Sequence, residues 1–467
     1  MSLSPPREEA KRRSPPPLKP PPSFPDLWFR RDKPPPKPRL PRPAESVDPT
    51  SSVSDELLLG ILARVPDSLT SPSYSLVCRR WLSLHGRLRR RLSLLEWTFL
   101  SSGRLGLRFP SLEEADLVPA CFAPPPRARS GIVLSRRSIS VPLDVLDRRV
   151  LAWDAIDEGL HALARGCPNI RKLAVVSASE SGLASIASGC ETLQELELHL
   201  CNDLSLKAIS GCRNLQILKL IGAVDGLYGG PGVSDVGLTI VAHGCKRLVK
   251  LEMSGCEGSY DGIRAMGTCC PMLEELTISD HRMDAGWIAA LWFCGNLKTL
   301  RLQGCKRIDA DPGPLEHLGA CPTIERLVLQ RCQLRDRQSL HALLMVCGAA
   351  REIVFQDCWG LDDETFGIVR ICRRIKFLLL EGCSLLTTAG LESVVLSWKD
   401  LQVLSVVSCN NIRDSEVTPA LASLFSVLKE LKWRPDSRSL LEMSFAGTGI
   451  GKKGGRFFKK VYHDRHE

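Results

Sequence analysis

The chain has 467 residues, of which 44% are hydrophobic and 24% charged, with 19 Cys and a formal net charge of +10. This length suffices for two or three ordinary domains, or for a solenoid in which each repeat packs only on its neighbours. The positive charge is concentrated at the two ends, and residues 93–446 carry slightly more acidic than basic side chains, which argues against nucleic-acid binding there.

Residues 1–50 hold sixteen of the 32 Pro residues. Such a segment cannot bury enough apolar surface to offset chain entropy, so we predict a disordered, basic, Pro-rich tail. Its Lys11-Arg12-Arg13 cluster fits either a nuclear-import signal or an ordinary solvated tail. There is no apolar stretch typical of a signal peptide, and no run approaches a membrane span. We therefore expect a protein of the nucleus or cytoplasm, or both, without a membrane partner.

Residues 51–92 have the pattern of two short amphipathic helices. In the first, Ser54 can serve as the N-cap, and Asp55 and Glu56 suit the positive end of the helix dipole. Its apolar residues recur at helical spacing as Leu57, Leu58, Ile61, Leu62 and Val65, and Pro66 ends it. Ser71-Pro72 is typical of the start of a second helix. That helix would present Leu76, Val77, Trp81 and Leu84 on one side.

The stretch DELLLGILARVP (residues 55–66), followed by SLVCRRW (residues 75–81), resembles an F-box. It departs from the family pattern at Val53-Ser54, where Leu-Pro is usual. The resemblance implies docking on the Skp adaptor of an SCF ubiquitin ligase, and through it on a cullin. The implied adaptor contacts are Leu57, Leu58, Ile61, Leu62, Pro66, Leu76, Val77 and Trp81. The alternative is that the segment only caps the repeats that follow.

Residues 93–158 are less regular and are predicted to form a linker with one or more degenerate first repeats. Phe109 to Leu117 has the pattern of a degenerate repeat strand, and Ala123 to Ser130, with three Pro, that of a loop.

From residue 159 to 434 one lattice, C-x2-L-x2-L-x-L, recurs ten times with conservative replacements. Predicted strand centres fall at Leu173, Leu196, Leu218, Leu251, Leu276, Leu300, Leu327, Ile353, Leu378 and Leu404, and at Leu431. Most intervals lie between 22 and 27 residues, within the range of leucine-rich repeats. The fold class predicted is an α/β leucine-rich-repeat solenoid, or horseshoe, preceded by a small all-α F-box. The repeats resemble the cysteine-containing type that often follows an F-box.

The cysteines are the anchors of this lattice, at Cys167, Cys190, Cys212, Cys245, Cys270, Cys294, Cys321, Cys347 and Cys372, with Trp398 replacing the last. Their spacing lacks paired C-x2-C motifs, so we interpret them as small buried hydrophobes and expect neither metal nor cofactor. No catalytic constellation is apparent. Gly447–Lys453 fails the phosphate-loop pattern, and residues 435–467 are predicted to be a basic C-terminal tail.

The concave sheet is the predicted substrate surface. Its central column is polar in the first half and becomes apolar after Arg301, through Val328, Val354 and Leu379, beside Phe377 and Val403. An apolar patch on a wet sheet is a candidate partner site, although ordinary β-propensity gives the same residues. One interval, from Leu218 to Leu251, is longer by an insertion at residues 222–232. Its Tyr228 is a candidate contact, with a tolerated mobile loop as the alternative.

The sequence therefore predicts the substrate-recognition subunit of an SCF-type ubiquitin ligase. The F-box would dock the adaptor, and the repeats would hold a protein substrate without bond-making chemistry of their own. The main alternative is a stand-alone leucine-rich-repeat interaction scaffold outside any ligase. A small-ligand receptor is a third possibility, for which a single insertion gives little support.

Overall fold

The computed structural model describes residues 49–64, 75–122, 150–222, 232–281, 283, 285–309, 311–313 and 315–435. The chain divides between Ile61 and Leu62 into two structural units. Nearly all of the predicted basic tails, together with Pro66 and Tyr228, lies outside the described residues.

A sheet of thirteen parallel strands, paired strictly in sequence order, forms the frame of the second unit. The strands are β1 (Arg91–Ser93), β2 (Glu114–Asp116), β3 (Lys172–Val176), β4 (Glu195–His199), β5 (Ile217–Ile221), β6 (Lys250–Ser254), β7 (Glu275–Ser279), β8 (Thr299–Gln303), β9 (Arg326–Gln330), β10 (Glu352–Gln356), β11 (Phe377–Glu381), β12 (Val403–Val407) and β13 (Glu430–Arg434). This order, one short strand per repeat, confirms the leucine-rich-repeat solenoid.

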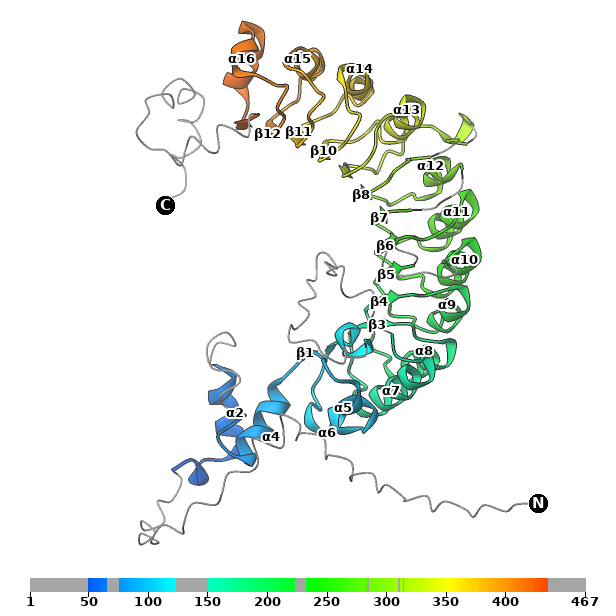
Figure 1. Cartoon of the computed structure of the whole chain (residues 1–467), viewed down its shortest axis with the longest axis vertical. Coiled ribbons are helices and arrows are strands. Elements are labelled where there is room, and N and C mark those ends of the chain that lie inside the picture. The colour runs from blue at the N-terminus through cyan, green and yellow to red at the C-terminus, as the bar shows by residue number, and fades with distance from the viewer. Residues whose placement is uncertain are drawn as a thin grey trace, which may run out of the picture. The chain divides into compact units, whose positions relative to one another are not determined.

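Helical segments follow the strands and line the outer side of the curved sheet (Figure 1). The α-helices are α2 (Asp55–Ala63), α4 (Arg79–Leu88), α5 (Trp97–Ser101), α6 (Arg104–Arg108), α7 (Trp153–Gly166), α8 (Glu180–Gly189), α9 (Asp203–Ile209), α10 (Asp235–Gly244), α11 (Tyr260–Cys269), α12 (Trp287–Ala290), α13 (Arg337–Val346), α14 (Asp363–Gly367), α15 (Thr388–Val395) and α16 (Pro419–Val427). The 3-10 segments are Pro49–Ser52, Val118–Cys121, Leu291–Phe293, Leu315–His317, Ile368–Ile371 and Asp414–Glu416.

The predicted strand centres are confirmed in register. Leu173 pairs with Leu196, Leu196 with Leu218, and the row continues through Leu404 to Leu431. Alternate strand residues point into the space between sheet and helices, so these leucines are buried there. Each contributes roughly 1.5–3 kcal/mol by leaving water, and each repeat covers the apolar face of the next.

The predicted role of the cysteines as buried packing residues is also confirmed. All but Cys78 and Cys269 are buried, and all are free thiols. Anchor thiols donate weakly to the preceding repeat, as Cys270 Sγ does to the Cys245 carbonyl at 3.6 Å. Burial raises the pKa of Cys190 and of Cys270 to about 12, so these thiols stay protonated and are poor nucleophiles.

Successive helices are joined by an aspartate that we call the Asp staple. The carboxylate comes from the first helical position in α9, α10 and α14 and from the fifth position in α7. It accepts bonds from both the amide and the hydroxyl of the next N-cap. The pairs are Asp157 with Ser179, Asp203 with Ser234, Asp235 with Ser259 and Asp363 with Thr387. In the Asp235 staple, Gly262 N–H also donates at 2.9 Å. A Cβ at Gly262 would overlap this carboxylate, so the staple needs glycine there.

Three predicted boundaries need correction. Leu76 and Val77 lie in a turn and α4 begins only at Arg79, because the extended Cys78 (φ −156°) is its N-cap, accepting from Trp81 N–H at 3.5 Å. The sheet begins at Arg91, inside the segment assigned to the F-box, where β1 pairs with β2. The first long repeat helix, α7, begins at Trp153, so the helix of this repeat starts before residue 159, the predicted boundary of the repeats. The strand expected between Phe109 and Leu117 is confirmed as β2.

Candidate functional site

Helix α2 carries four of the predicted adaptor contacts. Ser54 caps it as predicted, with its hydroxyl accepting from Leu57 N–H at 3.3 Å. Leu58 and Leu62, one turn apart, are buried, whereas Leu57 and Ile61 are 64% and 55% exposed. Residues four apart share a helix face, so α2 presents one covered and one open apolar face. Only Leu57 and Ile61 are available to a partner in this conformation.

The segment before α4 carries a second exposed pair. Leu76 and Val77 are 85% and 59% exposed, while Trp81 in the first turn of α4 is half-buried. Leu84, one turn further along α4, is buried. The predicted contacts thus separate into exposed apolar pairs and side chains that hold the local fold, and sequence spacing alone did not separate them.

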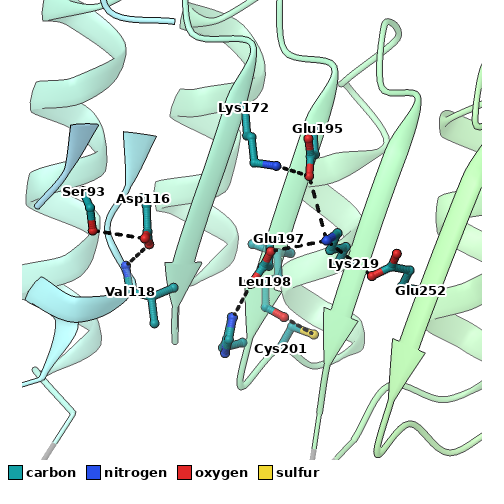
Figure 2. A network of polar contacts seen from close by, with 11 residues as sticks. Ser93, Asp116, Val118, Lys172, Glu195, Glu197, Leu198, Cys201, Lys219 and Glu252 are labelled. Carbon is teal, nitrogen blue, oxygen red and sulfur yellow. Dashed lines mark hydrogen bonds and ion pairs between the residues drawn. The ribbon is translucent and has the colours of Figure 1, made fainter. Parts of the chain in front are cut away.

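The first half of the concave sheet carries a network of ion pairs across β3 to β7. Figure 2 shows the part of it from Lys172 to Glu252. Lys219 on β5 lies at its centre, with Nζ 4.0, 3.9 and 3.4 Å from the carboxylates of Glu195, Glu197 and Glu252. Lys250 extends it to β7, with Nζ 3.0 Å from both Glu252 and Glu275. Lys172 on β3 pairs with Glu195. The network spans the sheet because each strand places its central residue beside that of its neighbour.

The charges within this network stabilise one another. Burial of Glu197 opposes its ionisation, but the hydrogen bond from His199 and the charges of nearby lysines outweigh burial and hold the pKa of Glu197 below its ordinary value. Burial likewise disfavours the charged form of Lys250, but its bonds to Glu252 and Glu275 prevail and raise its pKa. The polar side chains of this half are therefore largely engaged with one another.

The second half of the sheet aligns the predicted substrate residues on adjoining strands. Arg301, Val328, Val354 and Leu379 are consecutive register partners from β8 to β11. Phe377 pairs with Val403 at the first position of β11 and β12. Val354, Phe377, Leu379 and Val403 are half-buried, and Val328 is only 4% exposed between its two register partners. The expectation that Val328 is exposed is therefore wrong, and the apolar patch consists of the other four residues.

The repeat after β7 departs from the pattern at His281. Cys256, Cys305 and Cys332 each stand eleven residues after an anchor cysteine, and His281 takes that place after Cys270. The ring Nδ1 of His281 accepts from Met283 N–H at 3.3 Å, and burial lowers the pKa of His281 to about 4. Nearby, the buried Asp309 carboxylate accepts from Gly286 N–H and Ile288 N–H at 3.0 and 3.2 Å. Burial raises the pKa of Asp309 to about 6. Asp309 thus binds back to the preceding repeat instead of forming an Asp staple.

The Asp staples and the Asp309 site were missed by sequence reasoning. The signal available was Asp near the start of one helix together with Ser or Thr, two residues and Gly at the next helix start, as in Ser259–Gly262. Within the described ranges, no group of three or more His, Cys, Asp or Glu side chains is arranged to hold a metal ion. No helix in the described part of the chain is long and apolar enough to cross a bilayer.

Comparison with known proteins gives the following relatives. An F-box/LRR-repeat MAX2 homolog of Oryza sativa subsp. japonica is 26% identical over 219 residues, 41% of this chain and 30% of that protein. The F-box protein MAX2 homolog A of Petunia hybrida is 23% identical over 441 residues, 82% of this chain and 60% of that protein. The chain thus spans less than two thirds of either relative. It matches no known protein-family profile.

Among solved structures, an internalin (inlF) from Listeria monocytogenes superposes with a TM-score of 0.34 at 11% identity, covering 65% of this chain and 86% of that chain. The pairing of thirteen parallel strands in sequence order itself defines the fold. The strands and helices define a leucine-rich-repeat solenoid protein. In its F-box-like segment and its repeats, the chain is similar to these plant F-box/leucine-rich-repeat proteins.

Proposed function

We propose that the chain is the substrate-recognition subunit of an SCF-type ubiquitin ligase. The observation that carries the proposal is the pair of exposed apolar sites in the F-box-like segment, Leu57 with Ile61 and Leu76 with Val77. Exposed clusters of large apolar side chains commonly mark partner surfaces. In a stand-alone repeat scaffold these apolar side chains would stay exposed to water, whereas docking on a Skp adaptor would bury them.

In this proposal the chain contributes proximity rather than chemistry. The adaptor, and through it a cullin, would bind the F-box-like segment, and the solenoid would hold a protein substrate beside the ubiquitin-transferring enzyme. Tethering converts a bimolecular transfer into an effectively intramolecular one. We place substrate contact on the apolar patch of Val354, Phe377, Leu379 and Val403. A partner that bound the first half would have to displace or desolvate its ion pairs, which costs free energy. The four side chains of the apolar patch carry no charge, so binding there has no such cost.

The adaptor role is tested by binding of the full chain to a purified Skp adaptor. Leu57→Glu with Ile61→Glu should lower affinity by about 100-fold or more, since burial of each side chain is worth roughly 1.5–3 kcal/mol. Leu107→Glu is the matched control, because Leu107 is an exposed leucine on α6, and it should bind as the wild type does. Failure of the wild type to bind, or equal binding by the double variant, would reject the ligase role.

A further inference from the structure

A basic pocket lies where the end of α4, β1 and the end of α6 come together. Its volume is about 340 Å³, and Ser75, His85, Arg89, Arg91, Ser93 and Arg108 are among the residues that line it. This size is at the lower end of the range for small-molecule sites. Three arginines, a histidine and two serines therefore line a space that a small ligand can fill. The adaptor and substrate roles proposed above make no use of it.

Two guanidinium groups of this pocket, those of Arg91 and Arg108, differ in their partners. Arg91 Nε lies 2.9 Å from Glu114 Oε1, so Arg91 is paired with a carboxylate. Arg108 donates from Nη1 to the Leu82 carbonyl at 2.5 Å and lies over the Phe109 ring at 5.4 Å. No carboxylate among the described residues pairs with Arg108. Its burial lowers the pKa of Arg108, yet a guanidinium remains charged at neutral pH.

The fold holds Arg108 in place instead of leaving it on a mobile surface chain. Gly86 of α4 lies against the end of α6 so closely that a Cβ there would overlap the Arg108 carbonyl. The Leu82 carbonyl on the same helix accepts from the Arg108 side chain. On the pocket wall, Ser75 Oγ and the buried His85 Nδ1 lie 2.9 Å apart. Ser93 is oriented by its bond to Asp116 at 3.1 Å (Figure 2). The polar groups are thus positioned before any ligand arrives.

We propose that this pocket binds a phosphate group, either inorganic phosphate or a phosphate monoester carried by a small molecule or a phosphorylated side chain. The planar guanidinium fork matches two phosphate oxygens at once, which a lysine cannot do. Arg108 and Arg91 would supply such forks from two different elements. The hydroxyl of Ser75 can donate to a further oxygen when it accepts from His85 Nδ1–H. The space beyond the phosphate would take the group that carries it.

The test uses thermal unfolding and calorimetry of the full chain in inorganic phosphate, against chloride at matched ionic strength. Phosphate should raise the unfolding temperature of the wild type, because a ligand that binds only the folded state stabilises it. Arg108→Gln and Arg91→Gln should each weaken phosphate binding about tenfold or more, the loss of one charge-assisted hydrogen bond. Arg104→Gln is the matched control, since Arg104 is an exposed residue at the start of the same helix α6. It should bind phosphate as the wild type does.

Arg91→Gln keeps the test decisive should Arg108→Gln fail to fold, because Arg91 is exposed at the strand edge. Equal stabilisation by phosphate and chloride would overturn the proposal, as would phosphate binding by Arg91→Gln equal to that of Arg104→Gln. The source of the phosphate is resolved by two further ligands, a sugar phosphate and a short phosphoserine peptide with its unphosphorylated form. Tighter binding of the peptide only when phosphorylated assigns a protein source, and tighter binding of the sugar phosphate assigns a small molecule. No gain over inorganic phosphate assigns the free ion.

Discussion

The two halves of the concave sheet have the same backbone and opposite surfaces. From β3 to β7, Lys172, Lys219 and Lys250 alternate with glutamates, and the charges satisfy one another. From β10 to β12, the corresponding positions hold Val354, Phe377, Leu379 and Val403. The helices behind the sheet also have more polar links in the first half than in the second. Three of the four Asp staples join α7 to α8, α9 to α10 and α10 to α11, in the first half.

This difference indicates that the two halves of the solenoid differ in rigidity and in the cost of binding a partner. The first half is cross-linked by ion pairs on one side of the sheet and by Asp staples among the helices, so we expect it to be the more rigid frame. The second half has fewer such links and an apolar patch, which costs little to desolvate when a partner binds. The two irregular repeats that contain His281 and Asp309 mark the change from the first half to the second.

The largest expected effect follows loss of an Asp staple. Asp235→Ala removes an acceptor of three bonds, from Ser259 N–H, Ser259 hydroxyl and Gly262 N–H at 2.8, 2.6 and 2.9 Å. Chemical denaturation should show a loss of about 3 kcal/mol, since hydrogen bonds to charged groups contribute about 1.5–3 kcal/mol and buried donors are left unpaired. Asp261→Ala, which removes an exposed aspartate of α11, should cost little. Equal losses from both variants would contradict the staple.

The next effect concerns pH at the boundary between the halves. Because the pKa of His281 is lowered to about 4, against about 6.5 in the unfolded chain, the unfolded state binds a proton first on acidification. Stability is therefore lost as pH falls from 6.5 toward 4, by roughly 2–3 kcal/mol from this group. His281→Gln should remove that part of the loss in denaturation curves measured across this range.

Asp309 acts in the opposite direction, since its raised pKa of about 6 gives stability that is lost as pH rises through that value. Asp309 is present in both the wild type and His281→Gln, so the difference between their pH profiles reports on His281 alone. His341→Gln, at an exposed position of α13, is the control and should keep the wild-type pH dependence. An unchanged profile for His281→Gln would show that His281 is not buried as described.

A smaller effect distinguishes the two sheet surfaces by salt. Lys219→Met leaves the carboxylates of Glu195, Glu197 and Glu252 without their shared cation. We expect a loss of about 1 kcal/mol at low ionic strength that shrinks in high salt, as for other partly exposed ion pairs. Leu379→Met in the second half should show no dependence on salt. The comparison of the halves fails if both variants respond to salt alike.

Much of this fold could be predicted because its signals are local. The spacing of Leu173, Leu196 and their successors sets strand register directly, and the anchor cysteines follow from the same lattice. What could not be predicted depends on three-dimensional neighbours. The cover over Val328 comes from adjoining strands, and the partner of Asp235 lies in the next repeat. The late start of α4 depends on the backbone of Cys78, which helical spacing of apolar residues does not reveal.

Proximity labelling in cells tests most directly our proposal that the second half of the concave sheet holds the substrate. A parent carrying Leu57→Glu with Ile61→Glu would prevent substrate turnover. To it are added either Val354→Glu with Leu379→Glu, a register pair of the patch, or Ser254→Glu with Ser279→Glu, a register pair of the first half. Proteins labelled by the parent should be lost from the first variant and retained by the second. Identical labelling by both variants would contradict the claim.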